Sequence, residues 1–340
     1  MRKIQAVVSL ASKALVPGCA TDRRRLMRVM GTAMVALSAF TMPAKAALLA
    51  YDPFDVDGGP SAYLAGDDNT GINVLGGQNP TIGPTPFYAG GWIQSGGDAQ
   101  AVRDVGSLAY PLFPQSGGLV TDSVQFDCCS FGRSGREING GLGGGREPQT
   151  IYQSFLIDFG SQGTDDPTQF GFRGYEMWNG GIGDSFRSLQ LSVNHFSGVN
   201  ELTLQVTTGS GTQAALVNGG GLTLDVLEGV HLVVLAFDFN PSEDDIVRMY
   251  LDPTDSIEAN WAAAASIAVD ESDLFITHHS AISNFTFSGG GHIPGRFDEV
   301  RWGDTFADVT PFLTPVPEPA AMWLLLVGLL GIGVARRRRG

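Results

Sequence analysis

The chain has 340 residues, of which 43% are hydrophobic, and its formal net charge is −14 at pH 7. Residues 47–335 contain 34 acidic residues and nine basic ones, all arginines, so this part carries a formal charge of −25. A surface of this sign repels nucleic acid and anionic lipid, which excludes both as partners of the region between the termini.

The N-terminus has the three parts of a secretory signal peptide. A basic region at residues 23–28 precedes a thirteen-residue apolar stretch, and Ala44-Lys45-Ala46 is a small-x-small cleavage site. We therefore expect residues 1–46 to direct export, with cleavage after Ala46. The leader is long, so a translation start at Met27 or Met30 stays open. We favour the Sec route, although the arginine cluster also resembles a twin-arginine signal loosely.

Short β-segments separated by turns rich in Gly, Asp and Asn dominate residues 47–312. Leu189–Val193 and Leu202–Val206 alternate strictly, whereas His231–Phe239 is almost wholly apolar, as is typical of a central strand covered on both faces. Glu258–Ala268 is the segment whose composition favours a short helix. Further strands are predicted at Ile151–Phe159, Phe170–Met177, Ile246–Leu251, Leu274–His278, Phe285–Phe287 and Arg296–Trp302. About a dozen strands without a βαβ rhythm predict one antiparallel β-sandwich, and the fold class is all-β.

Cys128 and Cys129 are the two cysteines that remain once the leader is removed. Neighbouring cysteines pair only in a strained ring, because their Cα atoms are about 3.8 Å apart. Two free thiols, a vicinal disulfide and a bond to another chain therefore all stay open.

Two terminal segments resemble those of concanavalin A-like (LamG, jelly-roll) domains. Leu48 to Asp55 is similar to the opening strand of these domains, and Gly295–Gly303 followed by Phe306–Pro311 is similar to the closing strand. The resemblance implies that residues 48–54 and 296–302 lie side by side. It also implies a central hairpin made by residues 231–239 and 248–252.

Catalytic patterns of this fold are not evident in the sequence. Laminarinase-type glycosidases carry Glu-x-Asp-x-x-Glu on one strand, and this chain has no such motif. Asp298 and Glu299 are neighbours, so on a regular strand they point to opposite faces and cannot share a cleft. The same argument speaks against His278 and His279 as a zinc pair. We therefore expect a non-catalytic protein.

Two oxygen-rich loops are candidate calcium sites, because carboxylate and amide oxygens are the ligands that Ca²⁺ prefers. Solvated turns are the competing interpretation, since Asp and Asn also favour turns. The candidate ligands are Asp52, Asp55 and Asp57 in the first loop, and Asp238, Asn240 and Asp244 in the second.

Three aromatic residues beside glycine-rich turns are candidates for stacking on a sugar ring, namely Trp92, Tyr175 and Trp178. Rings in such positions also cap the core of a sandwich, so both interpretations stay open.

The C-terminal 25 residues have three parts in a fixed order. Pro317, Glu318 and Pro319 form an extended segment, the uncharged residues 320–335 would span about 24 Å as a transmembrane helix, and Arg336, Arg337, Arg338 and Arg339 follow. This pattern resembles the PEP-CTERM sorting signal. The resemblance implies that an exosortase recognises Pro317-Glu318-Pro319 and processes the chain there, after a transient stay in the inner membrane.

Together these patterns predict a signal peptide at 1–46, a sandwich domain at 47–312 and a sorting signal at 313–340. We expect an exported cell-surface or extracellular-matrix protein that binds glycans without cleaving them, with extracellular polysaccharide as its partner. A secreted glycosidase or lyase on the same fold is one alternative. A calcium-dependent adhesin is the other.

Overall fold

The computed structural model describes residues 48–56, 63–64, 75, 78, 87–96, 101–103, 107–114, 119–121, 131–143, 149–158, 171–180, 187–196, 199–209, 211–217, 229–269, 274–286 and 295–312. All of them belong to one compact unit that begins at Ala46. The predictions for the signal peptide, the sorting signal with its helix, Asp57, Cys128 and Cys129 concern residues outside this part.

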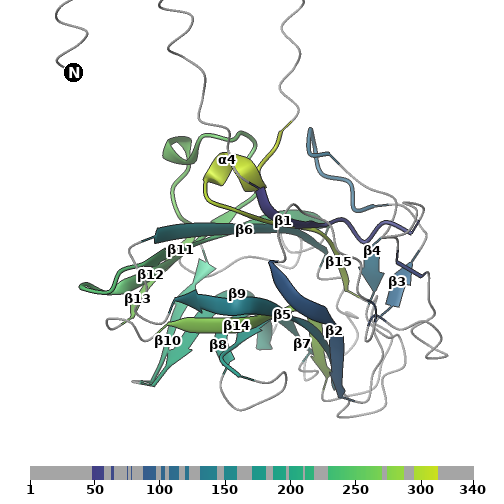
Figure 1. Ribbon diagram of the computed structural model, residues 1–340, viewed down its shortest axis with the longest axis horizontal. Helices are drawn as coiled ribbons and strands as arrows, with labels where there is room; N and C mark the ends of the chain where they lie inside the picture. Colours follow the sequence, from purple (N-terminus) through teal and green to yellow (C-terminus); the bar gives the residue numbers. More distant parts are fainter. Residues whose placement is uncertain are drawn as a thin grey trace, which may run out of the picture. The chain divides into compact units, whose positions relative to one another are not determined.

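Two antiparallel sheets form the fold, and Figure 1 shows them as two layers. The eight-stranded sheet has the order β13-β12-β11-β6-β15-β4-β3, with β1 also paired to β15. Its strands are β1 (Leu48–Asp52), β3 (Ala101–Arg103), β4 (Leu119–Thr121), β6 (Gln149–Asp158), β11 (Val230–Phe239), β12 (Asp245–Leu251), β13 (Ala265–Val269) and β15 (Arg296–Gly303).

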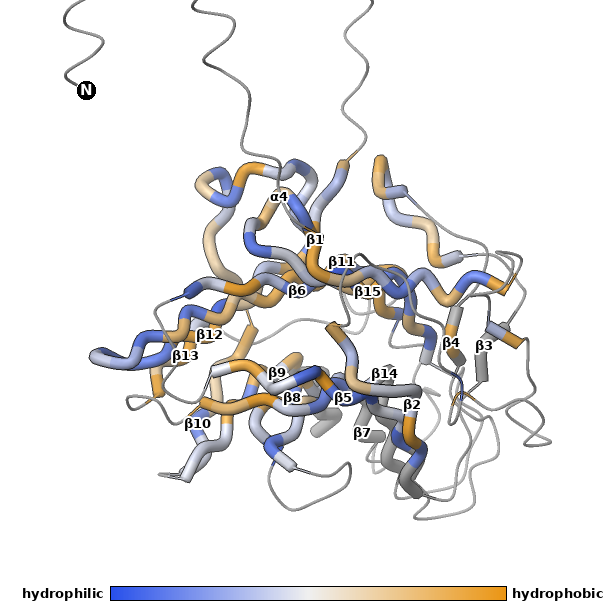
Figure 2. The backbone as a smooth tube through the Cα atoms, in the orientation of Figure 1, coloured by the Kyte–Doolittle hydropathy of each residue, from blue (hydrophilic) through white to orange (hydrophobic). Residues whose placement is uncertain are grey.

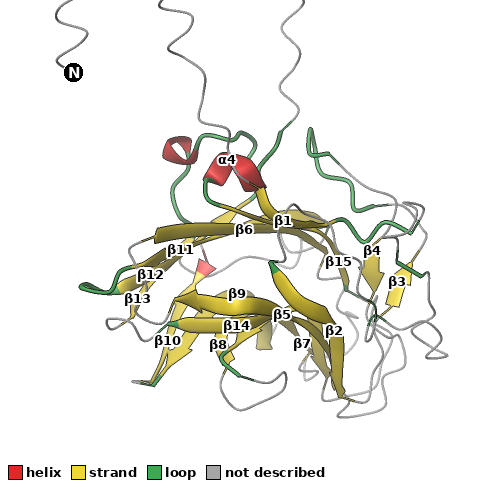
Figure 3. Cartoon of the chain, in the orientation of Figure 1, coloured by secondary structure: helices red, strands yellow, loops and turns green. Residues whose placement is uncertain are grey.

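The seven-stranded sheet has the order β10-β9-β8-β7-β14-β5-β2. Its strands are β2 (Tyr88–Gly96), β5 (Phe131–Gly143), β7 (Gly171–Trp178), β8 (Arg187–Phe196), β9 (Val199–Thr208), β10 (Gly211–Leu216) and β14 (Phe275–Thr286). In Figure 3, strands make up nearly all of the regular structure.

The strand pairing confirms the jelly-roll interpretation. β1 pairs antiparallel with β15, from Leu48 opposite Gly303 to Asp52 opposite Val300, so the first and last strands lie side by side. β11 and β12 form the central hairpin, from Val233 opposite Leu251 to Asp238 opposite Ile246. The fold is therefore an all-β sandwich of the concanavalin A-like kind.

The predicted helix at Glu258–Ala268 is wrong. Only Glu258–Asn260 is helical, as the single 3-10 turn η2, and Ala265–Val269 forms β13. The physical reason is the open edge of β12, whose residues Asp245–Met249 pair with β13 and outweigh the helix propensity of the alanines. The one short α-helix among the described residues is α4 (Phe306–Val309), which a Thr305–Asp308 capping box starts.

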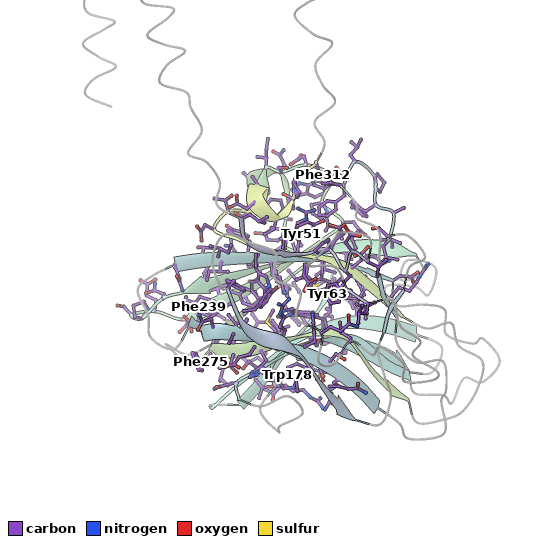
Figure 4. The ribbon with its side chains drawn as sticks, turned by 45° about the vertical axis from the view of Figure 1, so that its right-hand side comes forward. Tyr51, Tyr63, Trp178, Phe239, Phe275 and Phe312 are labelled. Atoms are coloured by element: carbon purple, nitrogen blue, oxygen red, sulfur yellow. The ribbon has the colours of Figure 1, made fainter. Side chains whose placement is uncertain are left out.

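Apolar side chains fill two cores. The larger core lies between the sheets and contains Phe155, Tyr175, Phe237 and Trp302. In Figure 4, Tyr63 and Phe239 lie between the sheets, and Phe312 lies on the outer side of the eight-stranded sheet. There a smaller core gathers Tyr152, Leu156, Val234, Tyr250, Phe306 and Val309.

β11 is apolar almost throughout because both of its faces are covered by these two cores. Figure 2 shows the contrast with the turn that follows it, which is hydrophilic.

Candidate functional site

The three aromatic residues predicted to stack on sugars belong to the interior. Trp92 is 1% exposed, and Tyr175 and Trp178 are 0% exposed. Stacking needs an open ring face, so this burial corrects the prediction. Tyr175 instead stacks on Phe155 at 4.4 Å between ring centroids, and Trp92 donates its Nε1 hydrogen to Tyr63.

Asp52 also lies inside the sandwich, where it forms an ion pair with Arg136. Arg136 Nη1 is 2.8 Å from Asp52 Oδ2, and the Tyr63 hydroxyl donates to Asp52 Oδ1 at 2.7 Å. Burial raises the pKa of Asp52, and the charge of Arg136 opposes this rise. Asp52 thus joins β1 of one sheet to β5 of the other. Asp55 is half-buried, and its carbonyl accepts a hydrogen bond from the Tyr63 amide at 2.9 Å.

The second predicted calcium loop is the turn between β11 and β12, and its polar groups bond to one another. The Asn240 amide donates to Asp245 Oδ1 at 2.8 Å, and the Ser242 amide donates to Asn240 Oδ1 at 3.1 Å. Asp244 is exposed, whereas Asp238 points to a different set of partners described below. Among the described residues, no three His, Cys, Asp or Glu side chains form a metal-binding group. Calcium binding at this turn stays a prediction.

A polar network that combines partly exposed charged side chains with two buried tyrosines covers part of the outer face of the eight-stranded sheet, and it is our candidate site. We call it the Glu258 network, and it consists of Thr150, Tyr152, Asp238, Arg248, Tyr250 and Glu258. The Tyr152 hydroxyl donates to Glu258 Oε2 at 2.8 Å, and the Tyr250 hydroxyl donates to Glu258 Oε1 at 2.5 Å. Arg248 Nη1 lies 3.5 Å from Glu258 Oε1.

Asp238 extends the same network along the sheet. Its Oδ2 lies 2.6 Å from Arg248 Nη2, and its Oδ1 accepts a hydrogen bond from the Thr150 hydroxyl at 2.7 Å. The side chains of Asp238, Arg248 and Glu258 are each about one-third exposed or less, at 28%, 31% and 28%. The carboxylates are therefore fixed in position and still reach solvent.

Strand register brings these residues together. Asp238 on β11 lies opposite Thr150 on β6, and Ala236 lies opposite both Tyr152 and Arg248. Because Ala236 is small, the longer side chains on either side of it can approach one another across β11. The η2 turn, which is the next element after β12, then supplies Glu258.

The protonation states of the network follow from burial and charge. Burial and the bond to Glu258 raise the pKa values of Tyr152 and Tyr250 well above the usual value, so both hydroxyls stay donors. Burial lowers the pKa of Arg248, but Asp238, Tyr250 and Glu258 more than offset this and hold it charged. The two carboxylates, which the buried phenols help to order, and the one guanidinium are partly exposed and suit a hydroxyl-rich ligand, which both donates and accepts hydrogen bonds.

Trp261 borders the network. The side chain is half-buried against the smaller core, and its Nε1 donates to Asp255 Oδ1 at 3.2 Å. Asp255 also accepts hydrogen bonds from the Ile257 amide and the Asn260 side chain, so one carboxylate holds the loop that carries Glu258.

Two further charged clusters are buried. Glu176 is 0% exposed, with Arg133 Nε at 2.8 Å and Arg187 Nε at 3.0 Å. Asp298 and Glu299 are also 0% exposed, and Glu299 has a φ of 56°, at an irregularity in the pairing of β15 with β6. Burial, then the neighbouring Glu299, raises the pKa of Asp298.

Asp298 and Glu299 each have a structural task. Asp298 accepts the Leu108 amide at 3.0 Å, while Glu299 binds the Tyr51 hydroxyl at 2.7 Å and Arg301 at 2.9 Å. The two histidines of β14 differ in burial, since His279 is buried in the core and His278 is half-buried.

Sequence reasoning found Asp238 but missed the rest of the Glu258 network. The residues come from four segments, β6, β11, β12 and η2, and β6 is a neighbour of the other three only through sheet order, so the spacing along the chain carries no signal. The alternation of Thr150 with Tyr152 and of Arg248 with Tyr250 is the one pattern that could have indicated a shared face.

Residues 315–339 match the family described as the PEP-CTERM protein-sorting motif. This motif indicates an exported protein that exosortase sorts and that is anchored in the membrane before cleavage. Among the described residues, no helix is long and apolar enough to cross a membrane, and the predicted span at 320–335 lies outside them. No curated protein matches the chain in sequence.

Solved structures with a similar fold include an endo-β-1,4-glucuronan lyase from Trichoderma reesei, at 13% identity and a TM-score of 0.40, with 62% of this chain and 90% of that chain covered. An alginate lyase from Chlorella virus has 9% identity and a TM-score of 0.37, with coverages of 63% and 93%. Lectin II from Ulex europaeus has 9% identity and a TM-score of 0.34, with coverages of 62% and 92%. Likenesses of this size carry no argument about activity.

Proposed function

We propose, on the premise of the PEP-CTERM motif at residues 315–339, that this chain is a cell-surface or extracellular-matrix protein that binds glycans without cleaving them. In this proposal the signal peptide is removed after Ala46. Exosortase then processes the chain at Pro317-Glu318-Pro319, while the helix at 320–335 and Arg336–Arg339 hold it in the inner membrane.

The Glu258 network is the observation that carries the binding proposal. Its carboxylates are ordered by tyrosine hydroxyls and Arg248, so they lose little conformational freedom when a ligand binds. Each carboxylate also keeps acceptor capacity toward solvent, which a sugar hydroxyl can use. The acidic, lysine-free composition of residues 47–335 suits a neutral rather than an anionic glycan.

The non-catalytic part of the proposal is supported by the location of the carboxyl groups with raised pKa values. Asp52 and Asp298 are 2% and 0% exposed, so neither can reach a glycosidic bond from its position. The third described carboxyl group with a raised pKa, Asp304, is exposed, and partial burial and the neighbouring Asp308 raise its pKa. Glycosidases of this general type need two carboxyls in one open cleft.

Glycan-array binding by the full chain tests the proposal, first for wild type and then for Glu258→Gln. We expect Glu258→Gln to weaken binding about tenfold, because one charged acceptor is lost. Glu137→Gln is the matched control, since Glu137 is an exposed carboxylate on β5 of the other sheet. Equal binding by wild type and Glu258→Gln would show that the glycan does not bind at the Glu258 network.

The same experiment separates the alternatives. New reducing ends or unsaturated sugars in the incubation would identify a glycosidase or a lyase. Binding that requires added Ca²⁺ and disappears with chelator would identify the calcium-dependent adhesin, with Asp238, Asn240 and Asp244 as the first residues to replace.

The sorting part of the proposal is tested by a separate experiment, the Glu318→Ala variant in the native host. We expect this variant to stay in the membrane fraction.

A further inference from the structure

β10 is an open edge of the seven-stranded sheet. The strand pairs with β9, and among the described residues it has no ladder partner on its other side. Five of its six residues are exposed and the sixth is half-buried. The register with β9 is unbroken from Gly211 opposite Thr208 to Leu216 opposite Thr203, so the strand is regular along its whole length. Figure 1 shows β10 at the left end of the lower layer.

The other ends of the two sheet paths carry features that hinder pairing with another chain. β2 has a register shift between Tyr88 and Trp92, and such bulges twist an edge away. β3 has only three residues, one of which is Arg103, and β13 has five residues, three of them buried. β10 has no charge, no proline and no irregularity. An exposed, regular edge of this kind is a template for another strand.

We propose that β10 is the interface for a second copy of this chain, with the two β10 strands paired antiparallel about a two-fold axis. An antiparallel strand is complementary to its own copy, so one edge serves both partners. Two copies, each with a net charge of −14, repel one another over most approaches. β10 and the neighbouring β13, which contacts it, contain no charged residue, so pairing through β10 brings no like-charged side chains of these two strands together.

Hairpin geometry identifies the backbone groups involved. Thr208 and Gly211 flank a two-residue turn, and the pair that closes such a turn is hydrogen-bonded. Because hydrogen-bonded and non-hydrogen-bonded pairs alternate, Thr212, Ala214 and Leu216 direct their N–H and C=O groups away from β9. These three residues would form the new ladder.

Sedimentation equilibrium of the full chain in density-matched detergent, under reducing conditions, measures the association. We expect a wild-type dimer, and we expect Ala214→Lys and Ala214→Pro each to raise its dissociation constant at least about tenfold. The lysine places like charges face to face, and the proline removes an outward N–H donor. Leu64→Lys is the matched control, because Leu64 is 63% exposed and away from β10, and it should leave the dimer unchanged.

Hydrogen exchange supplies a second measurement that does not depend on a variant folding. The amides of Thr212, Ala214 and Leu216 should gain protection as the concentration of wild type rises. A wild type that stays monomeric would overturn the proposal. So would a dimer that forms equally well in both Ala214 variants, or β10 protection that appears only when another protein is added.

Discussion

Single residues inside the sandwich carry unusual polar chemistry. His279 is 0% exposed, and its ring lies 5.2 Å from that of Trp92 and 5.7 Å from that of Trp302. Burial, reinforced by the charge of Arg136, lowers the pKa of His279 to about 3. A core histidine that stays neutral makes folding sensitive to acid.

The pH dependence of stability follows from this lowered pKa. Below about pH 6.5 the unfolded chain binds a proton at His279 and the folded chain does not, so stability falls as pH falls toward about 3. The slope from this group rises as the pH falls through 6.5 and approaches about 1.4 kcal/mol per pH unit near pH 5. Urea unfolding of wild type and His279→Phe between pH 7 and pH 5 measures it, and the variant should lose that part of the slope.

The comparison of slopes isolates His279 from the acidic groups. Asp52 and Asp298 have raised pKa values, so their protonation favours the folded state on acidification, and this contribution is common to wild type and variant. His278→Phe is the control, since His278 is half-buried and should change the slope less. Parallel slopes for wild type and His279→Phe would contradict the assignment.

At the scale of elements, close contacts between neighbouring strands depend on individual glycines. Gly143 on β5 has a φ of 77°, and a Cβ atom there would lie 2.1 Å from the Leu274 carbonyl oxygen and 2.6 Å from Phe239. The backbone at Leu274 cannot move away from an added Cβ atom as a flexible side chain could. The end of β5 therefore tolerates no side chain at this position.

We expect Gly143→Ala to destabilise the protein by about 2 kcal/mol or more, through backbone strain and overpacking together. Gly90→Ala on β2 is the matched control, because a Cβ atom there meets nothing within 4 Å. Thermal or urea unfolding of both variants checks the prediction. Equal stability of the two variants would show that β14 moves aside more easily than the contacts indicate.

Elements differ in how far the sequence predicts them. β11 is evident from its apolar run, and the β11–β12 hairpin from the polar turn, because both signals are local. The sequence predicts helix at β13 because the alanines favour helix locally, and only pairing with β12 decides otherwise.

At the scale of the whole molecule, one buried ion pair joins the two sheets. Arg136 on β5 and Asp52 on β1 are each 2% exposed as side chains, with 2.8 Å between Nη1 and Oδ2. Arg136 also donates to the Gly90 carbonyl at 3.0 Å, and its guanidinium lies 4.1 Å from the centre of the Tyr88 ring. Removal of one partner leaves the other as an uncompensated charge in the core.

We expect Arg136→Met to cost about 3–5 kcal/mol of stability, and the double variant Asp52→Asn/Arg136→Met to cost clearly less. Arg248→Met tests the contrast, because its partner Asp238 lies at the surface and exposed pairs contribute about 1 kcal/mol at most. Urea unfolding at pH 7 measures all three. A double variant as unstable as Arg136→Met would contradict a role for charge balance.

The sequence by itself determined the sorting motif at residues 315–339 and the class of the fold. The sorting motif is contiguous, so its order can be recognised without structure, and alternation with Gly-rich turns is enough to indicate a sandwich. Even the pairing of the first strand with the last, which the structure shows between residues 48–52 and 300–303, followed from the resemblance of the terminal segments. The sequence did not predict which polar side chains of the sandwich contact one another.

Tertiary structure decided which polar and aromatic residues face solvent. Trp92 and Asp52 are residue types common in binding sites, yet each is buried between the two sheets. Their burial depends on how the sheets pack, which the local sequence does not specify. Glu258, Tyr152 and Arg248 become one network only because β6, β11 and β12 are adjacent in the sheet. Strand order joins residues that are about a hundred positions apart, and no local pattern encodes that distance.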